Sequence, residues 1–326
     1  MPIQKVQKYP PFNVVRCSHV EYFVSDPGRS RAFWVEALGF VETACADGAL
    51  YLRGLEEHNH HCVVLRRGDM PLARRLGFKV FDEDDLDRAA HWFASQGLPC
   101  AWAEVAHQGR TLHAVDTLGT PLEFYYSMEQ VPSLLREYGR YAGARPARID
   151  HLNCFTPDVQ ASHDFYASLG FRTTEYTAAD GTEDLWAVWM HRKGNTHDMA
   201  LTNGRGPRLH HIGVWVPAVT DIIHACDVLA STGWLASMER GPGRHGIANA
   251  FFLYVRDPDG HRIELFTSDY LTVDPDLPPL RWDLRDPRRQ TLWGTPAPKS
   301  WFEEGSVFEG LAPRAPVLQA QPIVAP

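Results

Sequence analysis

Asp150-His151-Leu152-Asn153-Cys154-Phe155 is the stretch that decides the fold, because the chain contains a second version of it. The earlier version is Ser18-His19-Val20-Glu21-Tyr22-Phe23. In both versions two adjacent aromatic residues follow, and then a Leu-Gly-Phe triplet, at residues 38–40 and 169–171. Self-similarity along a chain indicates repeated supersecondary units. The sequence therefore predicts two related domains in tandem.

Each version has the residue pattern of a βαβββ unit that is used repeatedly. A strand comes first, an amphipathic helix ends at Gly39 or Gly170, and further strands follow. In a second helix, apolar Ile222 and Leu229 fall on one face before Gly233. Glycine after a helix fits the left-handed C-terminal cap. We therefore expect an α+β fold of tandem βαβββ modules in two domains.

Composition and motif positions divide the chain into segments. The C-terminal tail is rich in proline and has no hydrophobic periodicity, so we expect it to be disordered. The expected segments are an N-terminal arm (1–16), a first domain (17–128), a linker (129–148), a second domain (149–268), a lid or extension (269–310) and the tail (311–326).

The overall composition is that of a water-soluble enzyme. Its 326 residues are 44% hydrophobic, which is enough apolar material for two cores. A net charge of −8 argues against nucleic acid as the main partner. The chain has no long apolar run and no signal-peptide core at its start, so we expect no membrane association. Six scattered cysteines, without a Cys-x-x-Cys pair, indicate buried thiols in a reducing cytoplasm.

Three residues far apart in the chain have the chemistry of one metal site. His151, His211 and Glu264 each lie in a short apolar stretch with the alternation of a strand. Two neutral imidazoles and one carboxylate bind one face of a divalent ion and leave its other positions open. A lone strand histidine is more often packed or exposed than a ligand, but this trio occupies equivalent places in repeated units. We therefore expect a metal centre that suits non-haem Fe(II) and O2.

Strand alternation indicates where the middle ligand points. In residues 209–216, branched Ile212 and Val214 share one face, and His211 shares the other face with Gly213. The branched face should pack against helices. We therefore expect His211 to point to the metal site and its neighbour His210 to point away from it.

A hairpin precedes the third ligand. Pro258 occupies the second position of a type I turn, and Gly260 is placed for a bulge. The resulting three-residue loop makes Tyr254 the cross-strand partner of Glu264. Both side chains should then face the metal site.

The first domain contains only part of the ligand set. His19 and Glu123 match the first and third ligands, but the position that matches His211 is about Gly77. A glycine has no side chain to bind a metal. The sequence therefore predicts one metal site per chain, in the second domain.

These features resemble the type I extradiol ring-cleaving dioxygenases of the vicinal oxygen chelate superfamily, over nearly the whole chain. The most specific motif is Glu239-Arg240-Gly241-Pro242-Gly243-Arg244-His245-Gly246. Within the family, the motifs are most similar to those of the branch that cleaves homoprotocatechuate (3,4-dihydroxyphenylacetate). The other supporting motifs are Arg208-Leu209-His210-His211, the stretch 257–264, Arg288-Arg289 and Pro298-Lys299-Ser300-Trp301.

The resemblance implies an O2-dependent activity. It implies cleavage of homoprotocatechuate at the 2,3 bond to 5-carboxymethyl-2-hydroxymuconate semialdehyde. The implied metal is Fe(II), with Mn(II) as the alternative, because both accept imidazole and carboxylate ligands. The partners would be the catechol and O2, and the implied assembly is a homotetramer in the cytoplasm.

The resemblance also implies roles for residues around the metal. His197 matches the acid/base histidine, and we expect its imidazole to titrate near neutral pH. Tyr254 and His245 match residues that hydrogen-bond the substrate or oxygen intermediates. Asn153 matches a further neighbour of the metal.

Arginines match the residues that select the substrate. A guanidinium binds a carboxylate through two hydrogen bonds, and Arg240, Arg288 and Arg289 match the arginines around the substrate carboxylate. Paired arginines in an extension are otherwise solvated or support a subunit contact. Trp189 and Trp301 match the pocket walls. The segment before Trp301 is one residue longer than in the family pattern, so the register of the lid stays open.

Other functions share this fold, because fold alone does not fix function. One alternative is an extradiol dioxygenase for another carboxylated catechol. A second is a glyoxalase-like metal-dependent isomerase, and a third is a non-catalytic binder of small molecules. The isomerase would leave His197, Tyr254 and Arg240 without a role.

Overall fold

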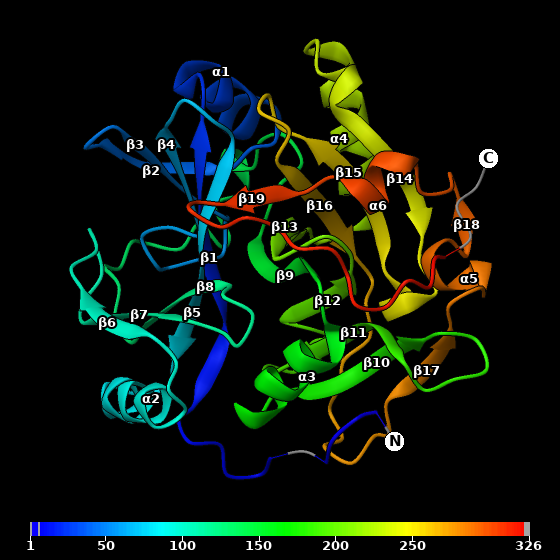
Figure 1. Ribbon diagram of the computed structural model, residues 1–326. Helices are drawn as coiled ribbons and strands as arrows, with labels where there is room; N and C mark the ends of the chain where they lie inside the picture. The colour runs from blue at the N-terminus through cyan, green and yellow to red at the C-terminus, as the bar shows by residue number, and fades with distance from the viewer. Residues whose placement is uncertain (1, 6, 323–326) are drawn as a thin grey trace.

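The computed structural model describes residues 2–5 and 7–322, and its first domain is built around strand β1 (Val14–Val24) (Figure 1). Hydrogen bonds join the strands in the spatial order β2-β3-β4-β1-β5-β8-β7-β6. The other elements are α1 (Pro27–Arg31), the π-helical turn η1 (Ala32–Ala37), β2 (Val41–Ala46), β3 (Ala49–Arg53), β4 (Val63–Arg67), β5 (Leu72–Val80), α2 (Asp84–Ser95), β6 (Cys100–Ala103), β7 (Thr111–Val115) and β8 (Pro121–Tyr125).

The second domain repeats this order around β9 (Arg148–Thr156). Its strands follow the order β10-β11-β12-β9-β13-β16-β15-β14. The α+β fold of tandem βαβββ modules is thus confirmed. The other elements are α3 (Val159–Ser168), β10 (Arg172–Ala178), β11 (Leu185–His191), β12 (Met199–Asn203), β13 (Arg208–Trp215), α4 (Val219–Ser231), β14 (Met238–Arg244), β15 (Phe251–Arg256), β16 (Arg262–Thr267) and the 3-10 turns η3 (Leu235–Ser237) and η4 (Ile247–Asn249). A further 3-10 turn, η2 (Tyr138–Arg140), lies in the segment before β9.

Strand register corrects the predicted match between the two domains. Gly77 on β5 and Gly213 on β13 each lie opposite the first histidine of their own domain. These glycines are therefore equivalent, and His211 matches Arg75 instead of Gly77. The prediction was wrong by two residues because loops of unequal length obscure the register. Arg75 has no lone pair to offer a metal, so the first domain still lacks the middle ligand.

The two domains share one hydrophobic core. In Figure 1, α1 and α4 lie toward the top and α2 and α3 toward the bottom, with strands between them. Phe78 of the first domain packs edge-on against Phe171 of the second, with ring centroids 6.1 Å apart. The indole of Trp34 donates a hydrogen bond to Asp257 at 3.2 Å. The domains are therefore packed firmly against each other.

The C-terminal extension joins both domains. Strand β19 pairs parallel to β5 and antiparallel to β13. The extension contains β17 (Leu280–Asp283), α5 (Pro287–Gln290), β18 (Trp293–Gly294), α6 (Lys299–Glu303) and β19 (Ser306–Phe308).

The tail was predicted to be disordered, and this is wrong through residue 322. Arg314 pairs with Gly206 in a β-bridge, and the carbonyl of Ala320 accepts a hydrogen bond from the Trp186 indole at 2.9 Å. A proline-rich segment without periodicity can still be held by its backbone carbonyls and single apolar contacts. Residues 323–326 of the predicted tail, and residues 1 and 6 of the predicted arm, lie outside the described residues.

Two further expectations concern membranes and cysteines. Over the described residues, every helix falls short of the length and apolar character that crossing a bilayer requires. The cysteines are free thiols, but the expectation that all are buried is wrong, because Cys45 is exposed. It lies on β2, at the edge of the first-domain sheet.

Candidate metal centre and substrate pocket

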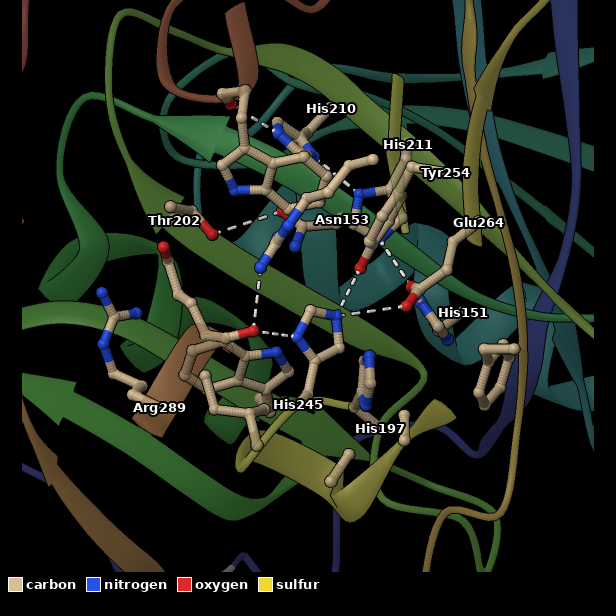
Figure 2. Close-up of a pocket in the computed structure, with 18 of the residues that line it drawn as sticks. His151, Asn153, His197, Thr202, His210, His211, His245, Tyr254, Glu264 and Arg289 are labelled. Carbon is tan, nitrogen blue, oxygen red and sulfur yellow. Dashed lines mark hydrogen bonds and ion pairs between the residues drawn. The ribbon is translucent and has the colours of Figure 1, made fainter. Parts of the chain in front are cut away.

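Three adjacent strands bring the predicted metal ligands together (Figure 2). His151 on β9, His211 on β13 and Glu264 on β16 each place a donor atom within 4.8 Å of the other two. The Glu264 Oε2 atom lies 3.0 Å from His151 Nε2 and 3.2 Å from His211 Nε2. All three side chains are buried. The chain therefore holds a compact two-histidine, one-carboxylate group.

Gly213 makes room for this group. It lies in register with His151 on one side and Glu264 on the other. A Cβ atom at Gly213 would lie 2.0 Å from His151 Cε1. Since real Cβ atoms do not approach so closely, only glycine lets the imidazole lie flat across β13.

A β-bulge places His210 in the pocket, against the expectation that it points away. Leu209 pairs with Cys154 and His211 with Asn153, so two steps along β13 face one step along β9. The extra residue in such a bulge escapes the alternation of the strand. His210 consequently lines the same pocket as His211 (Figure 2).

His210 determines which nitrogen of His211 carries a hydrogen. The Trp301 carbonyl can only accept, so His210 Nε2–H donates to it at 2.8 Å. A neutral His210 then accepts at Nδ1 from the Nδ1–H of His211, at 2.6 Å. The Nε2 atom of His211 is left with its lone pair, aimed at the Glu264 carboxylate.

This arrangement fits a divalent cation. A nitrogen lone pair and a carboxylate oxygen repel each other unless a positive charge lies between them. Burial opposes charge on Glu264, but its hydrogen bond with His151 keeps the pKa well below the usual range, so it is a carboxylate. Burial lowers the pKa of His211 to about 4, which keeps that imidazole neutral. The group therefore offers the ligand forms that Fe(II) and Mn(II) bind.

His151 retains a proton before a metal binds. Burial disfavours its charge, but the nearby carboxylates of Asp150 and Glu264 raise its pKa to about 9. A metal must displace this proton to bind Nε2, because a ligand imidazole is neutral. Asp150 lies 3.5 Å from the other ring nitrogen, Nδ1, and would orient the ring.

His197 lies against the metal ligands. Its ring centroid is 4.0 Å from that of His151, and Nδ1 is hydrogen-bonded to the Thr196 hydroxyl at 3.0 Å. Burial, followed by the charge on His151, lowers the pKa of His197 well below the usual range. The expectation that it titrates near neutral pH is therefore wrong for the free protein. A neutral imidazole beside the metal site can still accept a proton from an acidified hydroxyl.

Tyr254 and His245 form a second hydrogen-bonded pair in the pocket. Tyr254 is the cross-strand partner of Glu264, which confirms the predicted hairpin register. His245 Nδ1–H donates to the Gln290 carbonyl, so its Nε2 accepts from the Tyr254 hydroxyl at 2.9 Å. Burial raises the pKa of Tyr254 well above its usual range, so the hydroxyl keeps its hydrogen.

Two buried arginines line the pocket without a carboxylate partner among the described residues. Arg240 donates through Nη2 to the Gln290 carbonyl at 2.9 Å and to Thr291 Oγ1 at 2.7 Å. Its Nε and Nη1 atoms, and Nε of Arg289, are buried and have no hydrogen-bond partner in the described chain. Burial lowers the pKa of Arg240 to about 10 and that of Arg289 to about 9, so both are cations at neutral pH.

Aromatic faces support these cations. The Arg240 guanidinium lies over the Trp301 ring at 4.8 Å, and that of Arg289 over Trp186 at 5.1 Å. Trp301 thus lies in the pocket despite the extra residue before it. Trp189 and Asn153 line the same pocket.

Arg288 does not join the other predicted pocket residues. Its side chain is 70% exposed and pairs with Asp286 at 2.7 Å. On the short helix α5, Arg288 and Arg289 project in different directions, and only Arg289 turns inward. Adjacent arginines in the sequence therefore have different surroundings.

Several pocket residues were missed by the sequence analysis. Trp186 lies at a bulge of β11, between Leu185 and Ala187, and therefore shares the pocket with Trp189 against simple alternation. The only signal in the sequence was that Trp186 lies close to another tryptophan, Trp189. The other missed lining residues are Thr202, His210, Ile247, Ala248, Ala250, Phe266 and Gln290.

Comparison with known proteins agrees with this site. The family model described as "Glyoxalase/Bleomycin resistance protein/Dioxygenase superfamily" matches residues 16–112 and 148–265 of the chain. The structure of an extradiol ring-cleaving dioxygenase from B. fuscum superposes with a TM-score of 0.92 and 36% identity, covering 97% of this chain and 91% of that chain. The chain therefore belongs to this superfamily, as one of its extradiol ring-cleaving dioxygenases.

Two further relatives bear on substrate and metal. An anaerobic complex of homoprotocatechuate 2,3-dioxygenase from Brevibacterium fuscum with 3,4-dihydroxyphenylacetate has a TM-score of 0.88 and 38% identity, over 93% of this chain and 96% of that one. A manganese-dependent 2,3-dihydroxybiphenyl 1,2-dioxygenase from Geobacillus genomosp. 3 is 29% identical over 302 residues, 88% of this chain and 95% of its own. The predicted choice of Fe(II) or Mn(II) is confirmed, and the isomerase and binder alternatives lose their support.

Proposed function

We propose that this dioxygenase cleaves homoprotocatechuate at its 2,3 bond to 5-carboxymethyl-2-hydroxymuconate semialdehyde. The observation that carries the proposal is the pair of buried guanidiniums, Arg240 and Arg289, which have no carboxylate partner among the described residues. Leaving a charge buried and unpaired is costly. A carboxylate on the substrate would supply the missing partner.

The geometry of the pocket supports a substrate with two polar ends. Figure 2 shows Arg289 on the far side of the pocket from His151 and Glu264, with His245 between them. A catechol whose two oxygens face the histidines and Glu264 would direct a carboxymethyl group toward the arginines. Trp186, Trp189 and Trp301 would enclose the aromatic ring.

We propose that His151, His211 and Glu264 hold the metal. When bound there, Fe(II) or Mn(II) supplies open positions for the catechol and O2 and makes the catechol hydroxyls more acidic. The pocket residues then position the substrate and move protons.

His197 would act as the acid and base of the reaction. Its neutral imidazole would accept a catechol proton and return it later to an oxygen atom derived from O2, as the O–O bond breaks. The Tyr254 hydroxyl, which donates to His245 in the free protein, would turn its hydrogen toward an oxygen of the substrate or of O2. Both oxygen atoms of O2 enter the semialdehyde, so the reaction needs no external reductant.

Two adjacent arginines provide a matched test. In Arg289→Met we expect kcat/KM for homoprotocatechuate to fall about 30- to 150-fold, the equivalent of roughly 2–3 kcal/mol for charged hydrogen bonds. The value for 4-methylcatechol, which has no carboxylate, should change by less than about threefold. Arg288→Met is the control, since that side chain is exposed, and it should leave both substrates unaffected. Equal losses for both substrates in Arg289→Met would contradict the carboxylate role.

Another carboxylated catechol stays the alternative substrate. A homologue such as 3,4-dihydroxyphenylpropionate differs only in the distance from ring to carboxylate. A higher kcat/KM for that compound would replace homoprotocatechuate without changing the role of the arginines. The homotetramer and the cytoplasmic location stay predictions, and sedimentation velocity would test the first of these.

A further inference from the structure

A second group of two histidines and a carboxylate lies in the first domain. It consists of His60, His107 and Glu129, and one donor atom from each lies within 4.8 Å of the others. Donors on one zinc-type ion are at most about 4.2 Å apart, since each bond is about 2.1 Å long. Because the His60 and His107 rings lie face to face, one ring must also turn about its Cβ–Cγ bond before both in-plane lone pairs and Glu129 meet one ion. None of the three lines the substrate pocket.

Backbone hydrogen bonds hold the three residues together. The N–H of His60 donates to the carbonyl of Glu129 at 2.8 Å, and the N–H of Glu129 donates to the carbonyl of His107, also at 2.8 Å. β-bridges join the neighbouring residues on either side, Asn59 to Gln130 and Gln108 to Met128. Three loops that are distant in sequence are thus fixed before any ligand arrives.

The side chains are also oriented. The rings of His60 and His107 stack with centroids 3.7 Å apart and planes 9° apart. Tyr51 packs edge-on against both rings, at 5.2 Å and 4.8 Å. His60 uses Nδ1 to contact Nδ1 of His61 at 3.1 Å, which leaves its Nε2 for another partner.

The group is open to ions from one side. His60 is buried, whereas the side chains of His107 and Glu129 are 24% and 59% exposed and lie 2.8 Å apart. An exposed pair of this kind adds about 1 kcal/mol or less to stability. An ordinary exposed ion pair does not need a second imidazole stacked beside it, whereas this group has one.

We propose that His60, His107 and Glu129 bind a divalent transition-metal ion of the zinc type. Two imidazoles and one carboxylate suit Zn(II), and water would complete its four ligands. The ion would connect the loop before β4, the loop before β7 and the start of the 129–148 segment. Because this site lies outside the substrate pocket, the ion would stabilise the first domain and take no part in ring cleavage.

Zinc binding to this group is best measured in a variant whose second-domain ligand group has been disabled. In His211→Ala, which removes one ligand of the other group, equilibrium dialysis should find one tightly bound Zn(II) per chain. Loss of a residue that supports a metal ligand typically lowers the metal affinity tenfold or more, and loss of a ligand itself should cost at least as much. Adding Glu129→Gln should therefore weaken zinc binding tenfold or more. The control is Glu137→Gln, at an exposed glutamate that pairs with an arginine outside the group. Adding it should leave zinc binding unchanged.

Thermal unfolding provides a second readout on the same proteins. Zn(II) should raise the Tm of His211→Ala and of the Glu137→Gln control, but not of the Glu129→Gln variant. The single variant Glu129→Gln, loaded with Fe(II), should retain full ring-cleavage activity. Zinc binding that is absent in His211→Ala, or equal with and without Glu129→Gln, would overturn the proposal.

Discussion

At the scale of single residues, metal binding depends on whether His211 presents a lone pair at Nε2. The Trp301 carbonyl fixes the hydrogen of His210, and His210 in turn fixes that of His211. A sequence cannot reveal this chain of hydrogen bonds, because it depends on a carbonyl 91 residues away. Partners of metal ligands commonly set the ligand tautomer in this way.

His210→Phe should weaken metal binding because it removes the acceptor for His211 Nδ1–H. We expect the Kd for Fe(II) or Mn(II) to rise about 10- to 100-fold, while kcat per bound metal changes much less. His210→Asn, whose amide oxygen can accept the same hydrogen bond, should restore part of the affinity. Competition titration with a metal-binding dye measures both. An unchanged Kd in the phenylalanine variant would contradict the tautomer argument.

Gly213→Ala should abolish stoichiometric metal binding, because the added methyl group would occupy the place of the His151 ring. Gly77→Ala creates the same clash with His19 in the first domain, so it should reduce stability and leave the metal content unchanged. Gly139→Ala, where a Cβ meets nothing within 4 Å, is the neutral control. Metal analysis by mass spectrometry would separate these outcomes. Full metal content in Gly213→Ala would contradict the packing argument.

At the scale of elements, strand alternation predicted most of the site and failed at bulges. His211 and Tyr254 lie where alternation and hairpin length placed them. His210 and Trp186 were missed, because each occupies a bulge in its strand. A bulge leaves no clear mark in a single sequence, since backbone pairing creates it. The burial that lowers the pKa of His197 could not be predicted either, because it depends on how distant segments pack around the imidazole.

The tail contacts Trp186, a residue of the pocket wall, from outside the pocket. Ala320 accepts the indole hydrogen of Trp186, and Leu318 packs against the same aromatic cluster. A chain that ends at Pro316 should therefore leave Trp186 and Arg289 less fixed. We expect a several-fold higher KM for homoprotocatechuate and a smaller change in kcat, from steady-state O2 uptake. A chain that ends at Pro322 keeps these contacts and is the control; equal KM values for the two chains would exclude this role.

At the scale of the whole molecule, one carboxylate joins the extension to the second domain. Glu239 pairs with Arg262 at 2.6 Å and Arg256 at 2.7 Å, and accepts a hydrogen bond from Ser300 of α6. Burial opposes its charge, but these arginines lower the pKa of Glu239 to about 2. A carboxyl with a depressed pKa in the folded state stabilises the protein above its unfolded pKa of about 4.5. That contribution is lost as the pH falls toward 2.

Glu239→Gln should therefore lower the free energy of unfolding at pH 7 by about 2 kcal/mol. The difference from the native chain should shrink as the pH falls from about 4.5 toward 2. Urea unfolding at a series of pH values measures it. Glu36→Gln, at an exposed ion pair with Arg31, should have little effect at any pH. A pH-independent difference for Glu239→Gln would show that the charge of the carboxylate is not the cause.

The repeated architecture was predictable because its motifs recur in the sequence. The Gly77 match and the disordered tail were wrong because strand register and carbonyl contacts depend on the assembled molecule. Substrate preference lies at this scale too, since Arg240 comes from β14 and Arg289 from the extension. Both must meet at the pocket before a carboxylate can bind.

We propose that this chain opens the ring of homoprotocatechuate with O2. The direct measurement is to load the protein anaerobically with Fe(II), add homoprotocatechuate, admit air, and follow O2 consumption together with visible absorbance. We predict one O2 consumed per substrate and a yellow semialdehyde product. With metal bound and Arg240 and Arg289 intact, no O2 uptake and no yellow product would show that homoprotocatechuate is not the substrate.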